Sequence, residues 1–190
     1  VLVDAVPSVA AIQAYEKNYT FVKWEEDSQA KAQIVPYSER NGWTLPVSEN
    51  DYFMFTGWWT AHCAQEAYEE FETKTGIKPR PFINFIQDYE PGFYAWSTRY
   101  LLADATYKHP YPQIAVFNTK LLQDYFHWQG YKFYKEFAFD PVLNTVLKEK
   151  LYAMNSSMKK KKQILIYGRP GTERNAFKLI VAALRKWIGI

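Results

Sequence analysis

Short apolar runs of strand length alternate along the chain with longer segments whose apolar residues recur at helical spacing. Residues 82–86, 114–117 and 163–167 are almost entirely apolar, as strands buried on both faces of a parallel sheet are. Each run is followed by a segment with apolar residues three and four positions apart. This repeated strand–helix order predicts an α/β protein with a mainly parallel, Rossmann-like sheet flanked by helices.

Start and stop signals set the bounds of the predicted elements. Further strands are expected at residues 20–24, 51–55 and 132–139, and helices at residues 60–75, 97–107, 120–129, 141–151 and 175–187. Ser97, Thr119 and Asp140 are suited to cap helix N-termini, whereas Gly76 and Gly130 are suited to end helices. Spacing assigns these residues to the buried helix faces: Ala64, Ala67, Tyr68, Phe71, Leu101, Leu102, Ala105, Leu121, Leu122, Tyr125, Phe126, Leu143, Val146, Leu147 and Leu151.

A polar segment with four consecutive lysines, starting at Lys159, is the clearest linker. It predicts a first domain over residues 1–157, a linker at 158–162 and the opening strand–helix unit of a second domain at 163–190. One strand and one helix bury too little apolar surface to be a domain alone. The chain also begins without Met and ends shortly after a helical segment, so we expect it to be part of a longer polypeptide.

The charge balance excludes a broadly basic surface. The chain of 190 residues carries 23 Lys and Arg against 20 Asp and Glu, and the lysine run alone accounts for the excess. A nucleic-acid-binding role is therefore not expected, although the run could contact an acidic membrane surface. The single cysteine, Cys63, cannot form an internal disulfide. This suits a reducing cytoplasm, so we expect a cytoplasmic protein that could contact the inner face of the membrane.

Candidate chemistry lies in the turns that follow the predicted strands, because ligands of open parallel sheets bind at the carboxyl ends of the strands. The richest turn, residues 87–94, carries Asp88 and Glu90 among aromatic residues. In extended backbone these two residues share a face with Cα atoms about 6 to 7 Å apart. The pair could serve as a general base beside a second carboxylate, or as two oxygen ligands of a metal ion. The alternative is a turn in which Asp88 caps the following backbone and Glu90 is solvated.

Missing motifs narrow the function further. The chain has no G-x-G-x-x-G, no G-x-x-x-x-G-K-[ST], no G-x-S-x-G and no H-E-x-x-H pattern. Dehydrogenase, P-loop and serine-hydrolase functions are therefore disfavoured. The three histidines, His62, His109 and His127, lie in unrelated contexts, which disfavours a histidine metal cluster.

The turn at residues 168–171 is a second candidate. Arg169 and Arg174 precede a predicted helix N-terminus, where free backbone N–H groups favour an anion. The simpler alternative is that both guanidinium groups are only solvated.

Four segments, residues 56–61, 85–94, 114–119 and 164–177, resemble successive motifs of the rhamnosyltransferases of rhamnan synthesis, within the broad glycosyltransferase family 4 group. The resemblance spans roughly residues 51 to 187. It implies the GT-B fold, in which the first Rossmann-like domain binds the acceptor and the second binds a nucleotide sugar, typically dTDP-rhamnose. The remainder of the donor domain, with its paired glutamates, should lie after Ile190, and the glycine-rich first strand before Val1.

The resemblance also implies site residues. Asp88 or Glu90 would act on the acceptor hydroxyl, while Gly168, Arg169 and Arg174 would hold the donor diphosphate; Arg174 stands where many members carry Lys. Acceptor-binding residues would be Thr56, Trp58, Trp59, Thr60, Gln87, Tyr89, Phe93 and Asn118. No metal or other cofactor is expected beyond the nucleotide sugar.

The predicted reaction transfers a deoxyhexose, rhamnose in the leading interpretation, to an oligosaccharide or polysaccharide acceptor, free or lipid-linked. We expect residues 1–190 alone to be inactive. Three alternatives remain at this point: a glycoside hydrolase that uses the Asp88–Glu90 pair, a metal-dependent transferase of the other major fold, and a carbohydrate-binding module without chemistry.

Overall fold

The computed structural model describes residues 2–3, 8, 10, 20–21, 33–36, 47–154 and 161–189, and the chain divides into two compact units, Val1–Ser48 and Glu49–Ile190. The first unit contains a parallel sheet of three short strands, β1 (Leu2–Val3), β2 (Thr20–Phe21) and β3 (Gln33–Pro36), in the order β1-β3-β2. The strand expected at residues 20–24 coincides with β2, and its last three residues lie outside the described part. The predicted domain bounds stay a prediction.

The second unit contains a four-stranded parallel sheet that confirms the α/β class. Its strands are β4 (Met54–Phe55), β5 (Phe82–Ile86), β6 (Gln113–Phe117) and β7 (Lys135–Ala138), in the order β4-β5-β6-β7. The register pairs Phe82 with Gln113 and Ile86 with Phe117, so β5 and β6 end level with each other. The residues that follow these strands therefore meet at one edge of the sheet.

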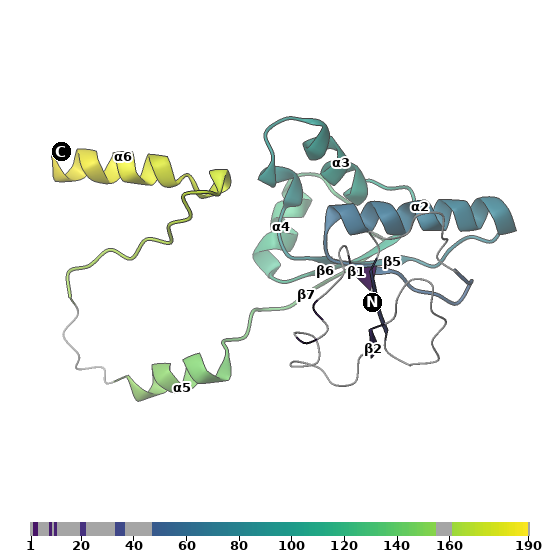
Figure 1. Ribbon diagram of the computed structural model, residues 1–190, viewed down its shortest axis with the longest axis horizontal. Coiled ribbons are helices and arrows are strands. Elements are labelled where there is room, and N and C mark those ends of the chain that lie inside the picture. Colours follow the sequence, from purple (N-terminus) through teal and green to yellow (C-terminus); the bar gives the residue numbers. More distant parts are fainter. Residues whose placement is uncertain are drawn as a thin grey trace. The chain divides into compact units, whose positions relative to one another are not determined.

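Three helices connect the strands of this sheet and lie over one of its faces (Figure 1). They are α2 (Trp58–Thr75), α3 (Thr98–Tyr107) and α4 (Lys120–Trp128). Gly76 ends α2 in the left-handed conformation that a side chain disfavours. A 3-10 turn, η1 (Glu90–Phe93), lies between β5 and α3. Because the strand order follows the chain order, successive right-handed crossovers put all three helices on the same face.

The core between these helices and the sheet is aromatic. Alternate residues of β5 and β6 are buried, and the buried set includes Phe82 and Phe117. The ring of Tyr68 from α2 stacks on Phe82 with centroids 4.7 Å apart. Phe126 from α4 meets Phe117 edge to face at 5.3 Å. Large rings of this kind bury much apolar area for each residue and so hold short helices on a small sheet.

The buried polar side chains of this core satisfy one another. Asn84 donates to the side-chain oxygen of Gln113 at 3.3 Å. Gln113 and Gln65 each donate to the carbonyl of Thr106, at 2.8 and 3.0 Å. These bonds join β5, β6, α2 and α3, and they avoid the cost of an unpaired buried amide.

The predictions of which helix faces are buried were partly wrong. In α3 the buried residues are Ala103, Thr106 and Tyr107, whereas Leu101, Leu102 and Ala105 are exposed. In α4 Phe126 is buried, but Leu121 is 81% exposed and Tyr125 is also exposed. Short helices over a narrow sheet bury only one row of side chains, and in α3 this row includes Ala103 and Thr106, whose carbonyl accepts from Gln113 of β6.

Two predicted elements near the C-terminus also differ. The helix expected from residue 141 begins later, as α5 (Thr145–Ala153), with Asn144 as its cap, and the stripe formed by Leu143, Val146, Leu147 and Leu151 is exposed. Residues 163–167 form no strand within the described part of the chain, and Leu165 is 99% exposed. A strand needs a hydrogen-bonded neighbouring strand, and these residues have none there. The last expected helix is present as α6 (Phe177–Ile188), after a 3-10 turn, η2 (Glu173–Asn175).

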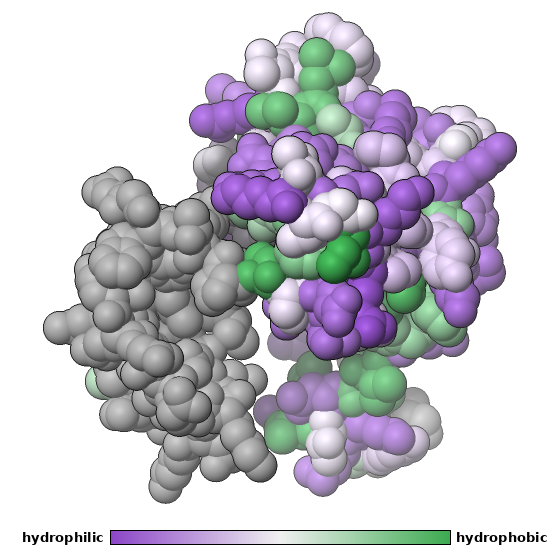
Figure 2. Space-filling model, turned by 90° about the vertical axis from the view of Figure 1, so that its right-hand side faces the viewer, coloured by the Kyte–Doolittle hydropathy of each residue, from purple (hydrophilic) through white to green (hydrophobic). Residues whose placement is uncertain are grey.

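The outer side of α2 is polar. Lys74 pairs with Glu70 at 2.5 Å on this side. Figure 2 shows the described atoms of the molecule from the side at which α2 ends in Figure 1, and hydrophilic residues predominate there, with apolar residues only in small separate groups. None of the helices in the described ranges is long and apolar enough to span a membrane.

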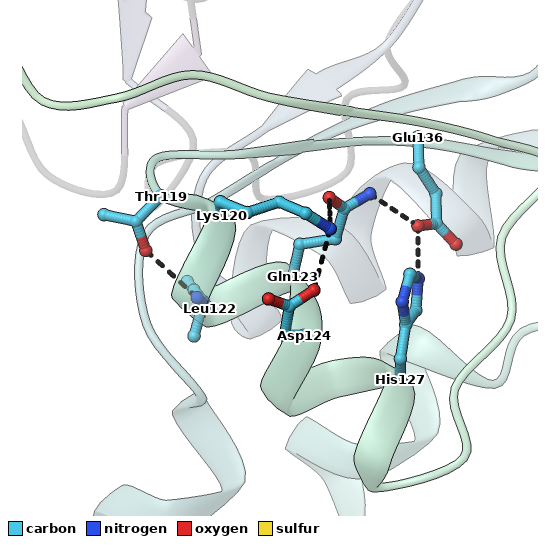
Figure 3. A network of polar contacts seen from close by, with 7 residues as sticks. All are labelled: Thr119, Lys120, Leu122, Gln123, Asp124, His127 and Glu136. Carbon is cyan, nitrogen blue, oxygen red and sulfur yellow. Dashed lines mark hydrogen bonds and ion pairs between the residues drawn. The ribbon is translucent and has the colours of Figure 1, made fainter.

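Replacing Thr119 by Ala should destabilise the second unit by about 1 kcal/mol, because the Thr119 hydroxyl accepts the backbone N–H of Leu122 at 3.0 Å and so caps α4 (Figure 3). Thr119→Ser keeps the hydroxyl and is the matched control. Urea denaturation of both variants checks the expectation. Equal stability of the Ala and Ser variants would show that the cap contributes nothing.

Candidate functional site

The turns that follow β4, β5 and β6 meet at the carboxyl edge of the sheet. Asn118, after β6, donates from its side-chain amide to the carbonyl of Gln87, after β5, at 3.0 Å. Its backbone N–H donates to the carbonyl of Ile86 at 3.2 Å. Thr56 and Gly57 follow β4 at the same edge. Three of the four motif-like segments of the sequence, residues 56–61, 85–94 and 114–119, therefore meet at this edge.

Glu90 ties the β5 turn to the start of α2. Its Oε2 accepts the backbone N–H of Trp58 at 2.7 Å and the hydroxyl of Tyr107 at 3.4 Å. The N-cap residue of α2 is Gly57, which has no side chain to accept a helix N–H. Glu90 supplies that acceptor from a distant part of the chain, and its negative charge lies at the positive end of the helix dipole.

Burial raises the pKa of Glu90 above its ordinary value of 4.5, and the nearby Asp88 charge raises it further. The hydrogen bonds from Trp58 and Tyr107 act in the opposite direction but do not cancel the effect of burial. The pKa of the Tyr107 hydroxyl is also raised, first by burial and then by the Glu90 charge. Glu90 is therefore a half-buried carboxylate held by two elements, not a solvated one.

The free energy of unfolding of the wild type relative to Glu90→Gln should fall as the pH rises through the pKa of Glu90. Between the ordinary value of 4.5 and the raised value, the folded chain keeps a proton that the unfolded chain has released, so this contribution to stability is present at low pH and lost as the pH rises. The substituted glutamine side chain keeps an acceptor oxygen but does not titrate. Urea denaturation from acid to neutral pH measures the difference, and a difference that grew with pH would contradict the assignment.

Two tryptophans follow Gly57, and their environments differ. The indole N–H of Trp58 donates to the hydroxyl of Tyr94 at 3.0 Å, and the two rings meet edge to face. The Trp58 side chain is thus engaged in holding the start of α2 against η1. Trp59 is exposed, and its ring covers Gly57 so closely that an added Cβ would lie 3.0 Å from it. The Thr60 hydroxyl donates to the carbonyl of Gly57 at 2.7 Å.

Asp88 is exposed and lines an open hollow of about 370 Å³. Its Oδ1 accepts the backbone N–H of Tyr89 at 2.8 Å, as the turn interpretation of the sequence predicted. The hollow is lined by Asp88, Tyr89, Gly92, Phe93, Leu122, Tyr125 and Arg174. Glu90 is not among these lining residues. The expected shared face of Asp88 and Glu90 does not form, because Glu90 begins the 3-10 turn η1, whereas Asp88 precedes it.

Leu122 and Tyr125 are lining residues that the sequence did not indicate. They lie three positions apart on α4, a spacing that puts both on one face of a helix. Periodicity assigned this face to the core. Phe126 is the buried core residue of α4 and the partly buried Leu122 packs against the same core, whereas Tyr125 is exposed beside the hollow.

Comparison with known protein families shows the family of this chain. The sequence model described as "WsaF, N-terminal domain" matches residues 1–120, and the model described as "WsaF, C-terminal domain" matches residues 162–189. The chain belongs to the WsaF family. This confirms the resemblance to rhamnan-synthesis glycosyltransferases that the sequence motifs predicted. Residues 82–118, which include Asp88 of the hollow, fall inside the matched N-terminal region.

The chain is also similar to a protein named "O-antigen biosynthesis protein RfbC" from Myxococcus xanthus. The two are 36% identical over 100 residues, which is 53% of this chain and 7% of that protein. The chain thus spans a small part of the length of this relative.

The donor-side residues predicted for this WsaF-family chain lie in a turn closed by Asn175. Its side-chain amide donates to the carbonyl of Tyr167 at 3.0 Å and its Oδ1 accepts the backbone N–H of Arg169 at 2.9 Å. Gly168 packs against the ring of Phe177, where an added Cβ would lie 2.7 Å from a ring carbon. Asn175 is thus a structural residue of this turn that the sequence did not single out.

Arg174 and Arg169 differ in their contacts. The guanidinium of Arg174 lies 3.7 Å from the centre of the Phe93 ring, and one of its nitrogens is 3.8 Å from Asp88. Arg169 is exposed and is not among the residues that line the hollow. The structure therefore brings Arg174, but not Arg169, next to Asp88.

A polar network fixes α4 to the neighbouring strand β7 (Figure 3). Glu136 accepts from Gln123 at 2.8 Å and pairs with His127 at 2.5 Å. Lys120 bonds Gln123 and Asp124 at 3.0 and 2.7 Å. His127 thus has a structural partner in β7. Across the described ranges, no group of three or more His, Cys, Asp or Glu side chains is placed to hold a metal ion.

Proposed function

We propose that this chain is part of a glycosyltransferase that transfers a deoxyhexose, rhamnose, from a nucleotide diphosphate sugar to a hydroxyl of a cell-surface polysaccharide. Membership of the WsaF family and similarity to a protein named for O-antigen biosynthesis support the transferase class. The proposed donor is dTDP-rhamnose. The proposed acceptor is an oligosaccharide or polysaccharide, free or lipid-linked, and the proposed location is the cytoplasm at the inner face of the membrane.

The observation that carries the proposal is the position of Asp88 at the carboxyl edge of the parallel sheet, exposed in a hollow with aromatic walls. Sugars offer a flat apolar face to an aromatic ring and hydroxyls to a carboxylate. Tyr89, Phe93 and Tyr125 supply rings around the same hollow. Edges of this kind are where parallel α/β sheets bind their ligands.

In the proposed reaction Asp88 is the catalytic carboxylate. It removes the proton from the acceptor hydroxyl as that oxygen bonds to the anomeric carbon of the donor and the bond from this carbon to the diphosphate breaks. The diphosphate leaves with the electron pair of the broken bond, and Arg169 and Arg174 neutralise its charge. Gly168 allows the donor turn to pack closely on Phe177.

Glu90 takes a positioning role in the proposal. Its carboxylate is directed to the N–H of Trp58 and the hydroxyl of Tyr107, and it is not a lining residue of the hollow. It holds the β5 turn, which carries Asp88, against the start of α2, which carries Trp59 and Thr60. The positions of the acceptor-binding residues therefore depend on it.

The test is a transfer assay with the full-length protein, radiolabelled dTDP-rhamnose and a rhamnose-containing oligosaccharide. We expect labelled, lengthened product, and less product with UDP-glucose as donor. Release of sugar from the oligosaccharide without nucleotide would identify a glycoside hydrolase instead. Loss of activity with EDTA and recovery with Mn²⁺ would identify a metal-dependent transferase, and glycan binding without turnover would identify a binding module.

A further inference from the structure

Five aromatic side chains form a connected series of contacts that includes two residues of the hollow, and we call this series the aromatic band. Its members are Trp96, Tyr100, Tyr89, Tyr125 and Trp128. Trp96 lies 5.1 Å from Tyr100, and Tyr125 lies 5.1 Å from Tyr89 and 5.7 Å from Trp128, between ring centroids. The hydroxyls of Tyr89 and Tyr100 are 3.4 Å apart and join the two halves. The band thus extends from the residue before the cap of α3 to the last residue of α4.

The two ends of the aromatic band are exposed to solvent. Trp96 is 77% exposed and Trp128 is 78% exposed, while Tyr89 in the middle is half-buried. Exposed single aromatic residues are common on protein surfaces, but a connected group marks a binding surface. Since Tyr89 and Tyr125 also line the Asp88 hollow, the band is continuous with the proposed acceptor site.

Each ring of the band carries an N–H or O–H group, and polar partners lie at the ring edges. The Tyr125 hydroxyl accepts from the side chain of Gln129 at 3.0 Å. The Tyr89 hydroxyl lies 3.1 Å from that of Tyr131, which donates to Asp104. Flat apolar faces bordered by hydroxyls and amides match a sugar ring, which has apolar C–H faces and a polar rim.

We propose that the aromatic band binds successive sugars of the acceptor, so that the acceptor is an extended glycan chain and Trp96 and Trp128 form binding subsites outside the Asp88 hollow. This inference rests on the proposed function and specifies its substrate class. The polar groups at the edges of the band favour a glycan over a lipid surface, because Gln129 and Asp104 border its rings with an amide and a carboxylate that can bond sugar hydroxyls. Its continuity with Asp88 favours a glycan over a separate protein partner.

The test is calorimetric titration of the full-length protein with rhamnose and with α-linked rhamno-oligosaccharides of two, four and six sugars, without donor. We expect affinity to rise with chain length. Trp128→Ala and Trp96→Ala should each weaken binding of the longest oligosaccharide about 10-fold, the effect of losing one ring contact, and leave binding of single sugars unchanged. Trp128→Phe keeps a ring and should recover most of the affinity.

Trp187→Ala is the matched control, because Trp187 is 70% exposed on α6 and lies outside the band. Equal affinity for all lengths, or equal loss with the control, would overturn the inference. The inference would also be overturned if the protein bound vesicles of acidic phospholipid and Trp128→Ala abolished that binding, because the band would then contact a membrane surface. Because the titration uses no donor, its outcome is independent of the transfer assay. Oligosaccharide binding without transfer would refute the proposed function. Transfer without length-dependent binding would refute the role of the aromatic band in binding the acceptor.

Discussion

Asp88→Asn in the full-length protein is expected to lower the rate constant for sugar transfer by about 100-fold or more, the range for removing a general base. The substitution keeps the shape of the side chain and removes its negative charge, and with it the ability to accept a proton and the ion pair with Arg174. The side-chain amide oxygen of Asn can still accept the N–H of Tyr89, so the turn should remain intact. Single-turnover measurement of labelled product gives the rate constant, and circular dichroism confirms the fold.

Glu90→Gln is the internal comparison for this variant. It retains an acceptor for the N–H of Trp58, so the rate should fall only a few-fold, whereas Glu90→Ala should lower it further because the start of α2 is released. Asp124→Asn, an exposed carboxylate on α4, is the matched control and should leave the rate unchanged. A wild-type rate for Asp88→Asn, or an equal loss with Glu90→Gln, would assign the chemistry to another residue.

The sequence predicted the central strands and two of the three helix N-caps, because these depend on local signals, whereas the cap predicted at Asp140 was wrong and Asn144 caps that helix. The apolar runs at β5 and β6 have few alternatives to a buried parallel strand, and Ser97 and Thr119 each accept the expected backbone N–H in the structure. The buried faces of α3 and α4 were predicted less well, since periodicity shows which residues share a face but not which face meets the sheet. Tyr107 is buried against Phe126 and Tyr131, and Glu90 accepts its hydroxyl; these long-range contacts have no local sequence signal.

In the candidate site, too, some features follow from local sequence signals and others depend on long-range contacts. The location of the site could be predicted from the chain, because parallel strands place their following turns at one edge. The separate orientations of Asp88 and Glu90 could not, since they depend on η1 beginning at Glu90 and on the absence of a side chain at Gly57, the cap of α2. Leu122 and Tyr125 of α4 line the hollow because Phe126 is the residue of α4 that is buried in the core.

Arg169→Ala in the full-length protein is expected to lower the rate constant for transfer by about 100-fold or more, the scale for one well-placed donor to a developing negative charge. The leaving diphosphate gains charge as the sugar bond breaks, so a guanidinium beside it should matter more for turnover than for ground-state binding. Asn175 holds the backbone N–H of Arg169, so the turn should survive the loss of the side chain. Arg174→Ala should lower the rate constant less, because the Arg174 guanidinium already contacts the Phe93 ring and the Asp88 carboxylate. Arg185→Ala, which replaces an exposed arginine on α6, is the matched control.

Transfer assays at a series of dTDP-rhamnose concentrations separate the effect of Arg169→Ala on kcat from its effect on KM. A change confined to KM would show that Arg169 contributes only to donor binding. An unchanged kcat and KM would show that Arg169 is not part of the donor site.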